Sequence, residues 1–239
     1  MTVEDIIKAV RWCYDEEQMD SADFGNASSN DNTLMDNIIK SKIGDAVRWI
    51  CLYCAPELLG GTDTEGVNTG IVYEGSITTK DNITDSSAGI VNGAPDSVTQ
   101  NRFVLPSNYV RLLRVRGSTW HRAVKGESLL SEDSDEYLQL HDPTCAYATA
   151  DRPQAALIEK ARKELECWPS ATTFEFTCIV TPAASNFDEE TIEDTGVAIP
   201  PLARTAFIYY LAFLVLSAYE DSRAARMLEI AKMNTGRNG

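Results

Sequence analysis

Residues 200–219 read PPLARTAFIYYLAFLVLSAY. Two prolines open this segment, and proline suits the first turn of a helix, where its missing N–H would have no partner anyway. From residue 206 to residue 216 the only polar groups are two tyrosine hydroxyls. A helix that is apolar on every side is a buried helix. We therefore expect this segment to form a core helix against which the rest of the chain packs.

The same helix is predicted to continue to Met233 and to stop at Asn234 and Gly236, which are typical of helix ends. The uncharged run lies between Arg204 and Glu220. A membrane span needs about 18–20 apolar residues, so the segment favours a protein core and no membrane partner. Beyond Glu220 the pattern is amphipathic. Its predicted inward residues are Ala224, Met227, Leu228 and Ala231, and its outward residues are Asp221, Arg223, Arg226 and Lys232.

The composition is strongly acidic, with 21 Lys and Arg against 36 Asp and Glu and a net charge of −15. Tight nucleic-acid binding depends on Lys and Arg against phosphate, so this charge argues against direct binding of DNA or RNA. The N-terminal residues, MTVED, have no features of a secretory signal, which predicts a protein that stays in the cytoplasm where it is made. The six cysteines are accordingly predicted to be reduced.

The N-terminal part of the sequence predicts two helices. A capping pattern at residues 2–5 precedes apolar residues at helical spacing, which predicts a first helix ending near residue 18. Residues 20–32 are rich in Ser, Asn, Asp and Gly and predict a loop. A second capping pattern at residues 33–36 predicts the start of a second helix, which ends by Pro56.

The middle of the chain predicts short strands after a long polar loop at residues 60–100. Residues 109–116 and 119–124 are predicted to form a hairpin across Gly117-Ser118. Residues 172–180 alternate most clearly, with Phe174, Phe176, Cys178 and Val180 on one side. The remaining predicted strands are 102–105, 137–140, 155–158 and 165–168.

Helices at both ends and strands between them predict an α+β protein. We expect a helical bundle built from both chain termini, residues 1–60 plus 184–239, which ends in the long C-terminal core helix. Residues 61–183 are expected to form a β-rich insertion with long polar loops. No repeat of fixed period occurs in the sequence.

Cys51 and Cys54 form the one motif that suggests redox chemistry. A C-x-x-C pair near a strand can be a redox centre, but this one lies late in a predicted helix and has no second pair to complete a zinc site. Thiols that pack in the core are the favoured interpretation. A cytoplasmic thiol redox or ligand-binding protein that uses Cys51 and Cys54 is the alternative function.

Histidine chemistry has little support in the sequence, because His121 and His141 are the only histidines and no G-x-S-x-G elbow occurs. We therefore predict no enzymatic activity, no catalytic residue, no cofactor and no metal.

Two groups of charges are candidates for binding a partner. Arginines gather on the predicted strands, where ion-paired strand edges are one interpretation and docking onto an acidic partner protein is the other. These are Arg102, Arg111, Arg114, Arg116 and Arg122. Acids gather at Glu132, Asp133, Asp135 and Glu136, where a solvated surface is the ordinary interpretation. In an assembly of many copies, these acids would form an acidic ring.

The order of the pieces carries a resemblance. Residues 104–116 read VLPSNYVRLLRVR and are followed by Trp120. Asp151-Arg-Pro153 and Leu165-Glu-Cys-Trp-Pro169 come next, then an alternating strand that ends at Pro182, and then the long helix. This order resembles the head-to-tail adaptor (connector, or ring) proteins of tailed bacteriophages. The tail tubular protein A type belongs to this group, and the ring proteins of crAss-like phages look most similar. The resemblance covers about residues 1–60 and 100–235.

The resemblance implies a virion structural protein at the head–tail junction. About twelve copies would form a closed ring that docks to the portal protein, extends the DNA channel and carries the next tail or ring protein. Genomic DNA would pass without specific binding, and the acids at 132–136 would line the channel. The C-terminal segment with Met233 and Arg237 would reach the portal. A phage tail-assembly factor is a further alternative.

Overall fold

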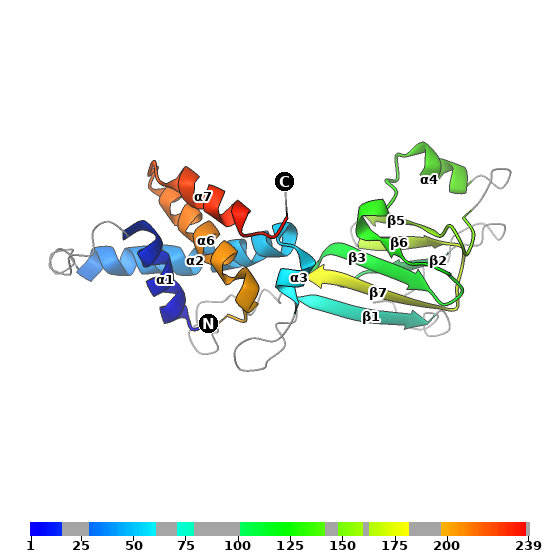
Figure 1. The fold of residues 1–239 in the computed structure, drawn as a ribbon, viewed down its shortest axis with the longest axis horizontal. Coiled ribbons are helices and arrows are strands. Elements are labelled where there is room, and N and C mark those ends of the chain that lie inside the picture. Colours follow the sequence, from blue (N-terminus) through cyan, green and yellow to red (C-terminus); the bar gives the residue numbers. More distant parts are fainter. Residues whose placement is uncertain are drawn as a thin grey trace. The chain divides into compact units, whose positions relative to one another are not determined.

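A computed structural model describes residues 1–15, 29–60, 71–78, 101–141, 148–159, 163–181 and 197–237. The chain forms two compact units. The helical unit comprises Met1–Ile71 and Thr181–Gly239, and the β unit comprises Val72–Val180. Figure 1 shows the helices of the first unit, and in the second unit the strands together with the short helix α4. The predicted α+β class is confirmed.

The helical unit is centred on α6 (Arg204–Ala218), which follows a short 3₁₀ turn, η4 (Pro201–Ala203). Three helices pack against α6: α1 (Val3–Asp15), α2 (Ser29–Tyr53) and α7 (Ala224–Met233). A four-residue helix, α3 (Pro56–Leu59), contacts η4. Phe207, Leu211 and Val215 of α6 are fully buried. Residues 206–216 form the predicted helix, but it is not buried on every side, because Tyr209, Tyr210, Phe213 and Leu214 are only half-buried.

The segment Pro201–Ala218 is the one part of the described chain that is long and apolar enough to cross a membrane, and 44% of it is buried inside the protein. The central helix of a protein core has the same length and composition. The finding is therefore weak evidence for a membrane span.

The C-terminal helical segment is two helices, α6 and α7, and the prediction of one continuous helix is wrong. Glu220 adopts a left-handed backbone conformation, with φ of 54°. The N–H of Glu220 donates to the carbonyl of Ser217, and the N–H of Asp221 donates to the carbonyl of Leu216. This is the Schellman pattern of helix termination. Glycine usually occupies the left-handed position, and its absence here is why the sequence does not reveal the break.

The starts of α1 and α2 differ in how well the sequence predicts them. The N–H of Asp5 donates to Thr2 Oγ1 at 3.1 Å, and the Thr2 hydroxyl donates to the Asp5 carboxylate at 2.7 Å, which confirms the first cap. Helix α2 already begins at Ser29, so the loop prediction is wrong over residues 29–32. Extending a nucleated helix by one turn costs little. Asp36, predicted to belong to a cap, instead accepts a hydrogen bond from Arg11 Nη2 at 2.6 Å.

The β unit contains two antiparallel sheets. The four-stranded sheet has the order β1-β7-β3-β4, and the three-stranded sheet has the order β2-β6-β5. Two short helical segments, η2 (Gly126–Ser128) and α4 (Asp135–Leu140), follow β4 in the sequence. The strands are β1 (Val72–Thr78), β2 (Asn101–Val104), β3 (Tyr109–Gly117), β4 (Val124–Lys125), β5 (Gln154–Glu159), β6 (Lys163–Trp168) and β7 (Thr173–Val180).

The two sheets pack face to face around one core. The ring of Phe103 on β2 lies 5.7 Å from that of Phe174 and 5.6 Å from that of Phe176, both on β7. Trp120 is buried in the same core, and its indole N–H donates to the carbonyl of Pro169 at 2.9 Å. Each sheet therefore has an inner face on this core and an outer face directed away from it.

Most predicted strands are confirmed: 102–105, 109–116, 155–158, 165–168 and 172–180 match β2, β3, β5, β6 and β7. The inward side predicted for the last strand is correct, because Phe174, Phe176, Cys178 and Val180 all belong to the core. Residues 72–78 were predicted as loop but form β1, which pairs along its whole length with β7. The rest of the predicted loop at 60–100 lies mainly outside the described residues.

Two further strand predictions are wrong. Residues 119–123 are not a strand, and only β4 (Val124–Lys125) pairs with β3 at this point. Residues 137–140 belong to α4, because the hydroxyl oxygen of Ser134 accepts a hydrogen bond from the Tyr137 N–H at 3.2 Å. A serine N-cap of this kind satisfies a free N–H group of the first helical turn.

Candidate functional site

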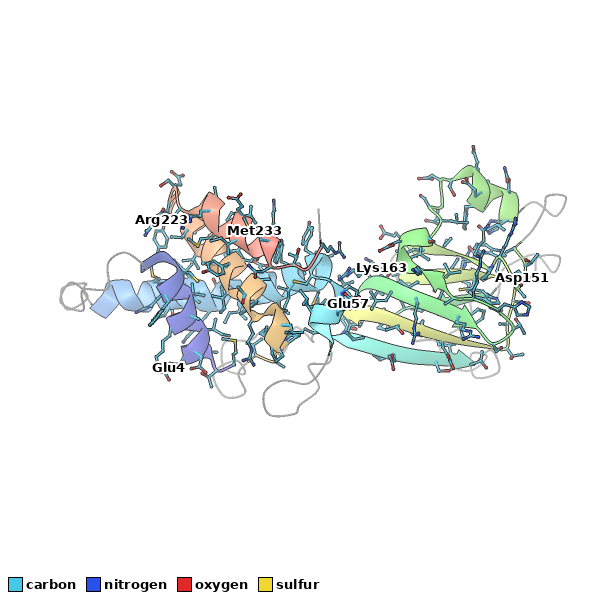
Figure 2. The ribbon with its side chains drawn as sticks, viewed as in Figure 1. Glu4, Glu57, Asp151, Lys163, Arg223 and Met233 are labelled. Atoms are coloured by element: carbon cyan, nitrogen blue, oxygen red, sulfur yellow. The ribbon has the colours of Figure 1, made fainter. Side chains whose placement is uncertain are left out.

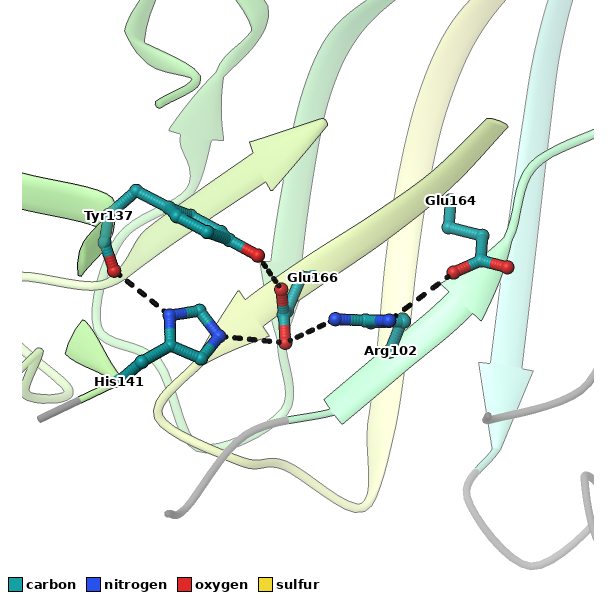
Figure 3. A network of polar contacts seen from close by, with 5 residues as sticks. All are labelled: Arg102, Tyr137, His141, Glu164 and Glu166. Carbon is teal, nitrogen blue, oxygen red and sulfur yellow. Dashed lines mark hydrogen bonds and ion pairs between the residues drawn. The ribbon is translucent and has the colours of Figure 1, made fainter. Parts of the chain in front are cut away.

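A polar network on the outer face of the three-stranded sheet has a buried carboxylate at its centre (Figure 3). Glu166 of β6 is fully buried. Arg102 Nη2 donates to Glu166 Oε1 at 3.1 Å, and the Tyr137 hydroxyl donates to Glu166 Oε2 at 2.9 Å. Arg102 Nη1 also lies 3.7 Å from a carboxylate oxygen of Glu164. A buried carboxylate is tolerated only when charge and hydrogen bonds compensate it, as they do here.

His141 completes this network from the C-terminal end of α4. Its Nδ1 lies 2.9 Å from the carbonyl oxygen of Tyr137, and its Nε2 lies 3.4 Å from Glu166 Oε1. A carbonyl and a carboxylate only accept hydrogen bonds, so a ring nitrogen that carries a hydrogen is the donor in either contact. Burial, followed by the hydrogen bond to Glu166, raises the pKa of Tyr137 and keeps its hydroxyl a donor.

Aromatic packing adds to the polar contacts and fixes α4 on the outer face of the three-stranded sheet. The ring of Trp168 lies 5.9 Å from that of Tyr137 and 5.4 Å from that of His141, edge to face in both cases. Leu140 and Ala156 are buried against Trp168. Figure 1 shows α4 beside β5 and β6, in agreement with these contacts.

The geometry gives Arg102 a structural role. Its side chain is 22% exposed and bridges two carboxylates of the neighbouring strand. Arg111 is half-buried and interacts within the chain. These two arginines were predicted as part of a partner interface; Arg102 is engaged inside the β unit, and the interface role of Arg111 stays a prediction.

Arg114 and Arg116 lie on the outer face of the four-stranded sheet. Their partners in the register of β7 are Thr177 and Glu175, which alternate with the inward-facing core residues. Lys125 of β4 pairs with Arg114 and shares this face. Arg114, Arg116 and Lys125 are all exposed, and we call them the basic column.

The basic column has only weak compensation within its own sheet. Arg114 Nε donates to the Thr177 hydroxyl at 3.1 Å, and its guanidinium lies 3.9 Å from the exposed carboxylate of Glu74. In the described part of the chain, neither Arg116 nor Lys125 has an ion pair. Two cations therefore remain available at this surface.

The acidic segment comprises Glu132, Asp133, Asp135 and Glu136, immediately before and within the first turn of α4. Glu132 is half-buried and the other three are exposed. Among the described residues, none of the four has an ion pair. Their predicted place along a DNA channel stays a prediction.

The remaining predicted interface residues lie in the helical unit. Met233, the last residue of α7, is 70% exposed, and Arg237 is also exposed. Figure 2 shows Met233 at the end of this helix. Between them, Gly236 has φ of +69° and packs against Leu58 and Ala55, so the end of the chain is anchored beside α3.

Cys51 and Cys54 lie fully buried at the C-terminal end of α2. Burial raises the pKa of Cys51 to about 12 and that of Cys54 to about 11. The thiolate is the reactive form of cysteine, and it is scarce at neutral pH when the pKa is this high. The burial and the raised pKa of both thiols favour the predicted packing role over the redox alternative.

The described residues contain no group of three His, Cys, Asp or Glu side chains placed to hold a metal ion. His121 Nδ1 lies 2.6 Å from Asp151 Oδ1 at an exposed position, and this contact lowers the pKa of Asp151. The pair is solvated and joins the loop after β3 to the turn before β5.

Sequence reasoning missed the network of Glu166, Tyr137 and His141. One signal was available: Glu166 interrupts the apolar residues of a strand, where a charge must find partners. No protein-family model matches the chain, and no curated protein matches it.

Proposed function

We propose that this chain is a head-to-tail adaptor ring subunit of a tailed-bacteriophage virion. The observation that carries the proposal is the order of elements: α1 and α2, then the β unit with VLPSNYVRLLRVR running from the end of β2 through β3, then α6 and α7. This is the order that the resemblance to adaptor proteins implies. We propose further that the helices from both termini form one bundle, with the β unit as an insertion.

The two-unit organisation supports this role. A subunit of a closed ring contacts its neighbours through two different surfaces. The β unit offers several exposed charges without ion pairs in its described part, and the helical unit exposes Met233 and Arg237 near the chain end. We propose that the portal protein binds this end and that the next tail component binds elsewhere on the ring.

The charge of the chain suits a ring through which DNA moves. A net charge of −15 disfavours the phosphate contacts that would hold DNA in place. We propose that genomic DNA passes through the ring without specific binding. The buried thiols at 51 and 54 give no support to a redox function.

The test is purification of DNA-filled virions on a density gradient, followed by quantitative mass spectrometry of the particle band. The proposal predicts about twelve copies of this chain per particle, the number that the resemblance to adaptor proteins implies for a closed ring. Empty heads that lack tails are the matched control and should contain far fewer copies. Absence of the chain from tailed particles, with free chain in the host cytoplasm, would contradict the proposal.

A further inference from the structure

The basic column and the acidic segment lie on opposite faces of the β unit. Arg116 and Lys125 stand on the outer face of the four-stranded sheet. Helix α4, with the acidic segment at its start, packs on Trp168 and Ala156, which belong to the outer face of the three-stranded sheet. The core residues, such as Phe103 and Phe174, lie between the two sheets.

This separation prevents the two groups of charges from pairing directly within one chain. Sheets packed face to face lie about 10 Å apart, and each group is on the far side of its own sheet. Both groups include charges that have no ion pair in the described residues. Glu74 and Glu175 share the face of the basic column, and Glu74 already lies near Arg114. The cations of Arg116 and Lys125 are the ones left to bind an acidic partner.

We propose that the acidic partner is the acidic segment of a second copy of this chain. The inference rests on the proposed ring and names the surfaces of its subunit contact. One copy presents Arg116 and Lys125, and the next copy presents Asp133 and Glu136 together with Leu138, a large apolar side chain that is 59% exposed on α4.

The arrangement selects head-to-tail association. A two-fold dimer brings the same surface of each copy together, which would place acid against acid or base against base. Like charges across an interface disfavour the wrong pairing, and complementary charges favour the right one. Opposite charges on opposite faces therefore leave head-to-tail contact as the favoured arrangement. Repeated contacts of this kind close into a ring when the rotation between neighbours closes, as the proposed ring requires.

The polar network of Glu166 gives the acidic segment a fixed position. Tyr137 within α4 and His141 at its C-terminal cap both contact the buried carboxylate of β6. A surface that is already ordered loses less entropy on binding. In the proposed contact, the acidic segment lies between subunits instead of along the DNA channel.

Two charge-reversal variants of the full chain test the contact. One carries Arg116→Glu and Lys125→Glu, and the other carries Asp133→Lys and Glu136→Lys. Reversing two surface charges should weaken self-association about tenfold for each variant alone, measured by sedimentation velocity. The first variant is acidic on both faces and the second is basic on both faces. An equimolar mixture should therefore recover the wild-type association, because every contact between the two variants joins an acidic face to a basic one. Arg226→Glu, at an exposed position of α7, is the control and should have no effect.

Carbodiimide cross-linking of mixed ¹⁴N- and ¹⁵N-labelled chains provides a second readout. Lys125 of one isotope should be joined to the acidic segment of the other, in solution or in material taken from particles. Absence of this cross-link in both samples, or no recovery on mixing, overturns the inference. Chains present at ring stoichiometry in virions but lacking the cross-link refute the contact and leave the proposed function intact. Cross-linked chains that are absent from virions support the contact between copies and refute the proposed function.

Discussion

Replacing Arg102 by leucine should destabilise the β unit strongly, because the buried carboxylate of Glu166 would lose its main cation. Removing one partner of a buried ion pair costs about 3–5 kcal/mol. Glu166 is 0% exposed and Arg102 is 22% exposed, so water can reach part of the gap. We therefore expect the lower end, about 3 kcal/mol, for Arg102→Leu. Arg116→Leu is the matched control and should change stability by less than about 0.5 kcal/mol, since Arg116 is exposed.

The assay must report on the β unit alone, because a chain of two units need not unfold in one step. Hydrogen exchange of peptides from β2 and β6, measured by mass spectrometry over a urea series, gives the opening free energy of this unit. The double variant Arg102→Leu with Glu166→Leu should recover part of the loss, since an apolar pair no longer buries an unpaired charge. Equal effects of Arg102→Leu and Arg116→Leu would refute the reasoning.

The buried thiols Cys51 and Cys54 should resist iodoacetamide at pH 8 in the native protein and react in urea; rapid native labelling would contradict their burial. The pKa of Asp221 is about 2, lowered by hydrogen bonds from Arg223. Its stabilising effect is present above the ordinary pKa and lost as pH falls toward 2, so NMR titration should give a midpoint near 2 that rises in Arg223→Ala. Leu211→Ala should cost about 2–5 kcal/mol, because Leu211 is fully buried in α6. A thermal shift no larger than that of a surface variant would rule this out.

The parts of the fold that sequence predicts well are those in which one face is buried. Residues 173–180 alternate because β7 lies between two other strands and turns one side to the core. Strand β1 has no such pattern, since VYEGSIT is polar and gains its conformation by pairing with β7. Its existence depends on residues about a hundred positions away, which no local pattern contains.

Short apolar runs and helix breaks were the least predictable features. Residues 137–140 suit a strand or a helix equally by pattern, and the Ser134 cap decides for α4. The break between α6 and α7 places Glu220 where glycine is usual. Local propensity was overruled at this position by the packing of α7 against α6.

The candidate site illustrates a different limit. The sequence reveals which arginines are present but not which of them have partners. Arg102 and Glu166 are 64 positions apart, and only the pairing of β2 with β6 brings them together. Arg116 looks the same in the sequence, yet it stands on the opposite side of the β unit. The register of the strands decides which arginines are exposed and which have ion-pair partners, and therefore which of them are free to bind a partner.

The register of β1 and β7 has a consequence for how this protein can be altered. Val72 pairs with Ile179, so the chain enters and leaves the β unit on neighbouring antiparallel strands. Paired residues of this kind have Cα atoms about 5 Å apart. A short linker could join residue 71 directly to residue 181 without a long detour. The β unit is thus a module that recombination could exchange for another while the helices around α6 are retained.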